Sequence, residues 1–458
     1  MTHILKYPIC LFLFINILTG LLKAQNTDTI EISGKIKWKN KTITGYPRDL
    51  KITSASKHEF ACSIDSMGNY VCRLPSGSYT LTPRLHYHWS GDDFIRIDEK
   101  HSRILITNSP QGSHNAPDLL LDTIGSPVPL PAIGIARKFS IANARLLDDY
   151  INKQMAYFEI PGASLGIIKN GKLIYHQVYG LSNIETGVSV TAKTLFEAGS
   201  VTKPVFAFVV MRLVEKKVLN LDQPLYQLLS FDEVAEDERY KLISARLILC
   251  HKTGLPNWRK SDSTGHFNLL FSPGTEFGYS GEGYEYLKRV IEHITGKNIS
   301  QIIKEELLVP LQLQGLWFKG SDYIKRNSSH GHNDLKPSDI RYFEQPMMAF
   351  SMCTEAKAFS NFMLALRNKK GLKRETYEEM LRIESTIEDS VHWSLGFQIQ
   401  ETSVGISYGH SGSTSSGFIC NFRYFPKLDI GYVFFTNSDM GAYLSIPLLT
   451  QLIVTDKK

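Results

Sequence analysis

The sequence predicts an α+β protein in which a small all-β domain precedes a larger domain built around an antiparallel sheet. Residues 30–122 alternate polar and apolar side chains between frequent turns, which is typical of half-buried strands, and no convincing helical pattern interrupts them. Later in the chain, helical patterns fill a region whose two ends both read as strands. We therefore expect one sheet that combines both ends of this region, with helices beside it.

The chain of 458 residues is predicted to divide into four parts. Residues 1–24 hold a lysine, a short apolar run and a small residue before a polar one, which indicates a cleaved signal peptide; a membrane anchor is the alternative. Residues 25–122 are assigned to the β domain, 123–136 with three prolines to a linker, and 137–458 to the larger domain. We expect an exported protein, periplasmic, associated with the cell envelope or secreted, without a stable membrane span after cleavage.

Composition and charge argue against several classes of protein. The chain is 43% hydrophobic and 21% charged, as globular proteins are. Removing the two lysines of residues 1–24 changes the net charge from +6 to 6 − 2 = +4, and no basic stripe with interleaved aromatics occurs, so nucleic acid is not an expected partner. No Cys-x-x-Cys spacing occurs, and His86 with His88 has no third ligand in view, so we interpret both as surface histidines. His330 and His332 are interpreted as loop residues and not as metal ligands. We expect no metal and no other cofactor.

The β domain contains two cysteines at close spacing. Cys62 and Cys72 would face each other across a hairpin turned at Asp65–Gly68, and export permits a disulfide, but two free thiols fit the sequence equally well. The surrounding run DSMGNYVCRLPSGSYTLTP resembles carboxypeptidase-regulatory-like or transthyretin-like modules, which implies a small β-sandwich. The residues that carry this resemblance are Asp65, Gly68, Tyr70, Pro75, Gly77 and Tyr79.

A hairpin signal opens the larger domain, after a helical pattern near 139–155. Two apolar strands flank Asn170–Gly171 in ASLGIIKNGKLIYHQVYG, and Asn-Gly is the preferred pair of a two-residue hairpin turn. The preceding residues 162–166 match Gly-x-Ser-x-Gly, a nucleophile pattern that needs a strand, a sharp turn and a helix. Because Ser164 precedes a hairpin instead, we interpret it as an ordinary strand residue.

Two Ser-x-x-Lys sequences occur, and their contexts differ. Ser54–Lys57 lies in the β domain. Ser200–Lys203 is followed by Pro204, which favours the first turn of a helix, and by the apolar run VFAFVVM, which predicts a buried helix. On that helix the lysine amine can reach the serine hydroxyl, and desolvation would lower its pKa. This segment alone fits a nucleophile with its base, or a helix-capping serine with a surface lysine, equally well.

Three later segments supply candidate partners for Ser200. LILCHKTGLPNW at 247–258 ends a helical pattern with a glycine and a proline. FGYSGEGY places Tyr279 on a turn before an amphipathic helix. YGHSGSTSSGF places His410 between strands, in a loop rich in glycine and serine where backbone can approach a ligand closely.

Taken in order, these segments resemble the serine β-lactamase and penicillin-binding-protein superfamily. The resemblance covers residues from about 140 to 450 and is closest to the branch of class C β-lactamases, D-alanyl-D-alanine carboxypeptidases and family VIII esterases. It rests on PGASLGIIKNGKLIYHQVYG, the second Ser-x-x-Lys, LCHKTGLP, the Phe-x-Tyr-Ser before Gly-Tyr, the late His-x-Gly and the closing FFTN. It implies an antiparallel sheet flanked by helices, together with an all-helical subdomain.

The resemblance also implies roles for individual residues. Ser200 corresponds to the acylated nucleophile, and Lys203 to its general base or base partner. Tyr279 corresponds to a second base and proton shuttle, whose phenolate would be favoured by the charge of Lys203 and of a protonated His410. The backbone N–H groups of Ser200 and Ser413 would form the oxyanion hole. Substrate-binding positions would be Gly281, Ser411 and Gly412.

Two departures from the family pattern bear on the substrate. Tyr279–Ser280–Gly281 stands in place of Tyr-x-Asn, and the loss of the asparagine amide argues against efficient turnover of β-lactams or peptidoglycan peptides. His-Ser-Gly at 410–412 stands in place of Lys-Thr-Gly, and a neutral histidine is a weaker anchor for a carboxylate. We predict an exported serine hydrolase that acts through an acyl-enzyme on an ester or amide of a small molecule or peptide. The alternatives are a β-lactamase or D,D-carboxypeptidase, and a non-catalytic envelope protein of the penicillin-binding type.

Overall fold

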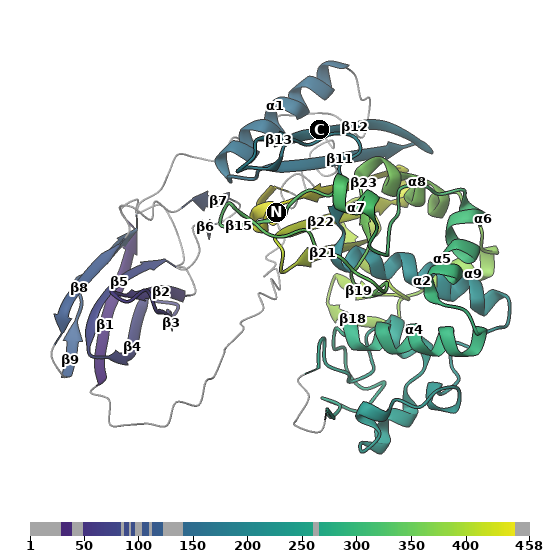
Figure 1. Ribbon diagram of the computed structural model, residues 1–458, viewed down its shortest axis with the longest axis horizontal. Helices are drawn as coiled ribbons and strands as arrows, with labels where there is room; N and C mark the ends of the chain where they lie inside the picture. Colours follow the sequence, from purple (N-terminus) through teal and green to yellow (C-terminus); the bar gives the residue numbers. More distant parts are fainter. Residues whose placement is uncertain are drawn as a thin grey trace. The chain divides into compact units, whose positions relative to one another are not determined.

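The computed structural model divides the chain into two compact units, Met1–Ser126 and Pro127–Lys458, which are described separately below (Figure 1). The predicted signal peptide, the predicted linker and His86 lie outside the described residues. The structure describes residues 29–38, 49–83, 87–90, 93–96, 103–109, 112–121, 141–259 and 265–444.

In the described part of the N-terminal unit, two four-stranded sheets share one apolar core. In β4 (Asn69–Pro75) the side chains alternate, so that Tyr70, Cys72 and Leu74 are buried and their neighbours are not. This confirms the predicted all-β sandwich; its relation to carboxypeptidase-regulatory-like modules stays a prediction. The first sheet contains β1 (Thr29–Trp38), β4, β9 (Gly112–Asn115) and β10 (Leu119–Leu121); the second contains β2 (Asp49–Ser54), β3 (Glu59–Ser63), β5 (Gly77–Pro83) and β8 (Ile104–Ser109); β6 (Tyr87–Ser90) pairs with β7 (Asp93–Arg96).

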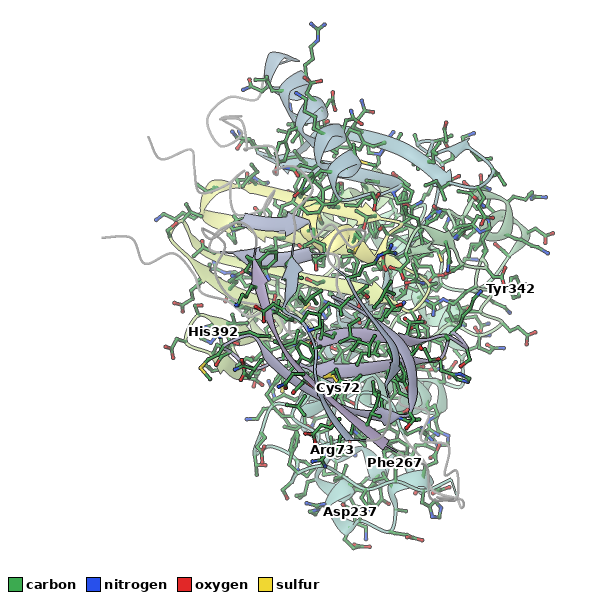
Figure 2. All side chains as sticks on the ribbon, turned by 90° about the vertical axis from the view of Figure 1, so that its left-hand side faces the viewer. Cys72, Arg73, Asp237, Phe267, Tyr342 and His392 are labelled. Carbon is green, nitrogen blue, oxygen red and sulfur yellow. A yellow bond between two sulfur atoms is a disulfide. The ribbon has the colours of Figure 1, made fainter. Side chains whose placement is uncertain are left out.

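A disulfide connects the two sheets of this unit. Cys62 of β3 is bonded to Cys72 of β4, with 5.7 Å between their Cα atoms (Figure 2, in which Cys72 is labelled). The predicted turn lies between the two strands: the Gly68 N–H donates to the Asp65 carbonyl over 3.0 Å, and Gly68 has a φ of +81°. Of the two states that the sequence left open, the structure therefore has the bonded one.

The C-terminal unit is built on one antiparallel sheet in the order β13-β12-β11-β23-β22-β21-β20-β19-β18. β11 from the start of the unit pairs with β23 from its end, which confirms that both ends of the region form one sheet. The first strands are β11 (Gly162–Lys169), β12 (Lys172–Asn183) and β13 (Val188–Ser189). The last are β18 (Ser385–Glu388), β19 (Val391–Trp393), β20 (Gln398–Thr402), β21 (Gly405–Thr414), β22 (Phe418–Phe425) and β23 (Ile430–Thr436).

The predicted hairpin joins β11 to β12. Its turn residues Asn170 and Gly171 have φ angles of +49° and +71°, which asparagine and glycine tolerate best. Ser164 lies within β11 and is 0% exposed, and its hydroxyl accepts a hydrogen bond from the Ala356 N–H over 3.3 Å. Its interpretation as a strand residue is confirmed.

Helices cover both faces of this sheet. Asp148 of α1 (Ile141–Tyr157) accepts hydrogen bonds from Tyr175 and Tyr179 on one face of β12. Ser164 and α8 (Ala356–Arg367) meet on the other face, because residue 164 alternates with the positions that pair with those tyrosines. Within the described residues no helix is both long and apolar enough to cross a membrane.

The helix α2 (Thr202–Glu215) is buried on every side, as the apolar run predicts: residues 205–211 are each 0–1% exposed. Phe208 packs against Phe362 of α8, and Phe206 packs against Tyr284 of α4 (Gly281–Thr295). α2 therefore lies between α8 and α4 (Figure 1). The other α-helices described in this unit are α3 (Ala245–Leu249), α5 (Ile299–Ile303), α6 (Val309–Leu311), α7 (Asp322–Asn327) and α9 (Arg374–Met380). Two short strand pairs lie outside the large sheet: β14 (Phe196–Glu197) pairs with β17 (Cys353–Thr354), and β15 (His332–Asn333) pairs with β16 (Lys336–Pro337).

Candidate active site

Ser200 lies in η1 (Gly199–Val201), a single turn of 3-10 helix that leads directly into α2. Lys203 is on the first turn of α2, and its Nζ donates to the Ser200 Oγ over 3.1 Å and to the Ala349 carbonyl over 2.9 Å. Pro204 follows at a position where its missing N–H costs nothing. The predicted approach of the lysine amine to the serine hydroxyl is therefore present.

The Lys203 amine is removed from water. The side chain is 1% exposed, and burial lowers the pKa of Lys203 to about 7, although the negative charge of Glu285 opposes this shift. The rings of Tyr279 and Tyr284 lie over the amine, with their centroids 4.7 and 5.4 Å from Nζ. Near neutral pH a large share of the molecules carries Lys203 as a neutral amine that can accept a proton.

Tyr279 lies on the turn before α4, where the Ser280 hydroxyl caps the helix by accepting the Gly283 N–H over 3.1 Å. Burial raises the pKa of Tyr279, and an interaction with the Ser200 hydroxyl opposes that shift only in part. The Tyr279 hydroxyl is buried and has no hydrogen-bond partner of ordinary geometry among the described residues. The expectation of a phenolate is wrong for the free protein, because desolvation outweighs the attraction of nearby positive charge.

His410 lies inside β21 and pairs with Phe422 of β22; the expected loop is not present. Backbone pairing with β22 holds residues 408–414 extended, whereas β20 pairs with β21 only as far as Gly409. The His410 Nδ1 donates to the Ser411 carbonyl over 2.6 Å, and burial beside Lys203 lowers the pKa of His410 to about 3. This agrees with the neutral histidine expected at position 410, and it leaves a protonated His410 little weight as a source of positive charge near Tyr279.

Two glycines bring β21 against the turn that carries Ser200. A Cβ on Gly412 would lie 2.2 Å from the Ala198 carbonyl and 3.1 Å from the Ser200 amide nitrogen. A Cβ on Gly199, which has a φ of +50°, would lie 3.1 Å from the Ser413 amide nitrogen. Only glycine at both positions allows this approach, which places the Ser200 and Ser413 amides at one contact between the two segments.

Comparisons with known proteins place the chain in a family. The chain matches the model of the Beta-lactamase family over residues 147–445, which is more than half of its length. It belongs to the beta-lactamase family. Protein flp of Staphylococcus aureus (strain MW2) is 26% identical to it over 201 residues, which cover 41% of this chain and 40% of that protein. The chain therefore spans less than half the length of this curated relative.

Solved structures share the fold of this beta-lactamase family chain. The octameric penicillin-binding protein homologue from Pyrococcus abyssi matches with a TM-score of 0.58 and 22% identity, over 68% of this chain and 77% of that one. A class C beta-lactamase mutant matches with a TM-score of 0.60 and 18% identity, over 68% and 96%. The predicted family and the predicted fold are confirmed.

His251 is a buried residue of the family site to which sequence reasoning assigned no role. It is 0% exposed, and its ring centroid lies 4.2 Å from that of Tyr279. The His251 Nδ1 accepts the Ser280 N–H over 3.1 Å, so its ring fixes the turn that carries Tyr279. Burial holds the pKa of His251 well below its ordinary value. Its position in the segment LCHKTGLP was the available signal, but the sequence does not show which face of Tyr279 that segment covers.

The three substrate-binding positions differ in what they present. Gly412 contributes backbone to the contact with the Ser200 turn. The Ser411 side chain alternates with His410 along the strand, and its hydroxyl accepts from Asn421 Nδ2 over 2.6 Å. Gly281 is the first residue of α4, and its N–H donates to the carbonyl and to the side-chain oxygen of Asn257, both over 3.0 Å.

Proposed function

We propose that this beta-lactamase family protein is a serine hydrolase that cleaves an ester or an amide through an acyl-enzyme on Ser200. The observation that carries the proposal is the buried Lys203 amine, 3.1 Å from the Ser200 Oγ and with a pKa of about 7. A serine hydroxyl is a weak nucleophile unless a base removes its proton, and a neutral lysine amine within hydrogen-bond distance meets that need.

The first step forms the acyl-enzyme. Lys203 accepts the Ser200 proton while Oγ attacks the carbonyl carbon, and the carbonyl oxygen becomes negatively charged. The N–H groups of Ser200 and Ser413, brought together by the two glycines, are the donors that would stabilise this oxygen.

The collapse of this intermediate requires a proton for the leaving group. Tyr279 is a neutral phenol above Lys203, so it can donate its proton to the leaving oxygen or nitrogen and regain one from the Lys203 ammonium. Water then attacks the acyl-enzyme while neutral Lys203 accepts its proton. The bond between the carbonyl carbon and Ser200 Oγ breaks, Lys203 returns the proton to Oγ, and the acid product leaves. Burial shifts the pKa values of Lys203 and Tyr279, the two groups that transfer protons, and such shifts are typical of catalytic sites.

The surroundings of His410 favour binding of an uncharged substrate group over a carboxylate. Its Nδ1 donates to Ser411, which leaves Nε2 as a buried acceptor without a partner among the described residues. An acceptor of this kind suits a neutral donor on the substrate and does not attract a carboxylate. Export, envelope association and the division into domains 25–122 and 137–458 remain parts of the proposal.

Covalent labelling tests the proposal. The protein is treated with a fluorophosphonate, the adduct is measured by intact mass, and the modified peptide is mapped. We expect one adduct on Ser200, none in Ser200→Ala, and full labelling in the matched control Ser54→Ala. Hydrolysis of an aryl ester and of a chromogenic cephalosporin is followed in parallel, with the ester as the better substrate. Labelling that survives Ser200→Ala would contradict the assignment, and a better rate on the cephalosporin would favour a β-lactamase.

A further inference from the structure

Trp258 fills the space beside Gly281, two residues after Tyr279. A Cβ on Gly281 would lie only 2.7 and 2.8 Å from the Cη2 and Cζ2 atoms of the Trp258 indole, and 3.0 Å from the Asn257 carbonyl. Any side chain at 281 would therefore have to displace the indole. The Trp258 indole thus occupies the space that a side chain at position 281 would need.

The loop around Trp258 is held on both sides. Before it, the Asn257 carbonyl accepts the N–H groups of Gly281 and Glu282 over 3.0 and 3.1 Å. After it, the Arg259 N–H donates to the Glu282 carboxylate over 3.1 Å, and its guanidinium donates to the same group. The two anchors belong to the first turn of α4, so the indole has little freedom to leave Gly281.

Trp258 is the first of three aromatic rings in contact, here called the aromatic wall, and the last two come from the segment that follows Pro337 and includes Ala349. Its ring packs edge-on against Phe350 with centroids 5.3 Å apart, and Phe350 packs in the same way against Phe343 at 5.4 Å. Phe350 directly follows Ala349, whose carbonyl holds the Lys203 amine. All three rings are partly exposed. Trp258 contacts Gly281 and Phe350 follows the residue that holds the lysine, so the row of rings connects the two segments that contribute to the site.

The charge next to this wall is neutralised. The Arg341 guanidinium lies 5.4 and 5.8 Å from the ring centroids of Phe343 and Phe350, and it is paired with the buried Glu197 carboxylate. Glu197 also accepts the Ser416 hydroxyl over 2.8 Å. Of the described residues, Arg341 is therefore not a free cation that could bind an anionic substrate group.

We infer that the aromatic wall of Trp258, Phe343 and Phe350 binds the acyl group of the substrate, and that this group is an apolar or aromatic chain without an amide next to the carbonyl. The inference rests on the proposed function and specifies its substrate class. An amide placed against the indole would lose its hydrogen bonds to water without replacement, which disfavours binding. An apolar chain at the same place is removed from water at no such cost.

A matched pair of esters tests this preference. Ethyl 4-phenylbutanoate and ethyl N-benzoylglycinate have the same chain length between ring and ester carbonyl, and only the second carries an amide. We expect wild-type kcat/KM to favour the phenylbutanoate by roughly tenfold or more, because a desolvated amide is left unpaired. Trp258→Ala should lower kcat/KM for the phenylbutanoate by roughly tenfold through lost apolar contact, while Trp258→Phe should keep most of it. Equal rates on the two esters in the wild type would overturn the inference.

A pair of exchanges at the contact sharpens the test. Gly281→Asn alone should lower the activity on both esters, because the new side chain collides with the indole. Gly281→Asn combined with Trp258→Ala removes the collision and supplies an amide, so the preference should shift towards N-benzoylglycinate by at least tenfold relative to the wild type. Circular dichroism of each variant checks its folding. A folded double variant with an unchanged preference would show that this contact does not select the acyl group.

A binding measurement separates this inference from the proposed function. Ser200→Ala binds the two intact esters at equilibrium, and calorimetry is expected to give the same preference in Kd for the phenylbutanoate. Turnover by the wild type without a preference contradicts the inference alone. Preferential binding without turnover contradicts the proposed hydrolysis alone.

Discussion

The chain contains the same four-residue pattern, Ser-x-x-Lys, in each of its two units, and only the second copy has its lysine amine hydrogen-bonded to its serine hydroxyl in the structure. In the N-terminal unit, Ser54 ends β2 and its hydroxyl accepts the His58 N–H over 2.9 Å, within the turn to β3. Lys57 has a φ of +64°, and its side chain is exposed to solvent. The Ser54 hydroxyl therefore stabilises the turn, and the Lys57 amine stays hydrated.

The second copy differs in backbone and in surroundings. Ser200 and Lys203 lie on consecutive helical turns, so the two side chains share a face and meet at 3.1 Å. The packing of α2 removes the lysine from water and lowers its pKa to about 7. The comparison shows that a helical backbone sets the direction of the lysine amine and that burial sets its charge. The Ser-x-x-Lys pattern by itself determines neither.

The largest expected effect on the rate of hydrolysis comes from removing the lysine amine of the second Ser-x-x-Lys copy, with the first copy as its control. Lys203→Met should reduce kcat/KM for an aryl ester by about a thousandfold, because general-base assistance is lost. Lys57→Met is the matched control and should leave the rate unchanged. The comparison would collapse if both substitutions, measured side by side, had equal effects.

The pH dependence follows from the lowered pKa of Lys203. The base is active when neutral, so kcat/KM should rise with pH and level off above about 7, falling by about tenfold for each pH unit below that value. His410 has a pKa of about 3 and is already neutral throughout this range, so His410→Gln should keep the same inflection even if its rate is lower. A profile that falls between pH 6 and 8 would instead require a protonated group.

The disulfide offers a perturbation confined to the other unit. It closes a loop with a sequence separation of 10, for which chain entropy predicts a contribution of about 2–3 kcal/mol to stability. The double substitution Cys62→Ala, Cys72→Ala should lower the unfolding temperature of the N-terminal unit and leave ester hydrolysis unchanged. Calorimetry of the whole chain, with the rate as a second readout, checks this. If ester hydrolysis were lost together with the stability of the N-terminal unit, that unit would contribute to turnover.

The smallest expected effect is on the stability of the catalytic unit. Folding lowers the pKa of Lys203 from 10.5 to about 7, so between these values the unfolded state binds more protons and the stability rises with pH. Lys203→Met lacks this dependence. Its melting temperature should exceed that of the wild type by a few degrees at pH 6, and the difference should shrink by pH 9. Lys57→Met should show no pH-dependent difference, and a constant gain in Lys203→Met would exclude proton linkage as its cause.

Local signals in the sequence were sufficient for much of the fold. Asn170–Gly171 specified the turn between β11 and β12, since few other pairs adopt two positive φ angles. Pro204 placed the start of α2, because proline lacks the N–H that an inner turn requires. Apolar runs at both ends of the larger region predicted the shared sheet. Each of these features depends on residues close together in the chain.

By itself, then, the sequence determined the class of fold, the family and the pairing of Ser200 with Lys203. The tertiary structure alone decided that His410 lies in a strand, that burial favours the phenol form of Tyr279, and that an indole lies where Gly281 has no side chain. The physical reason is that helix starts and turns are set by neighbouring residues, whereas desolvation, strand pairing and side-chain collisions depend on partners far along the chain. Trp258, 23 residues before Gly281, can be recognised as its counterpart only after both are folded.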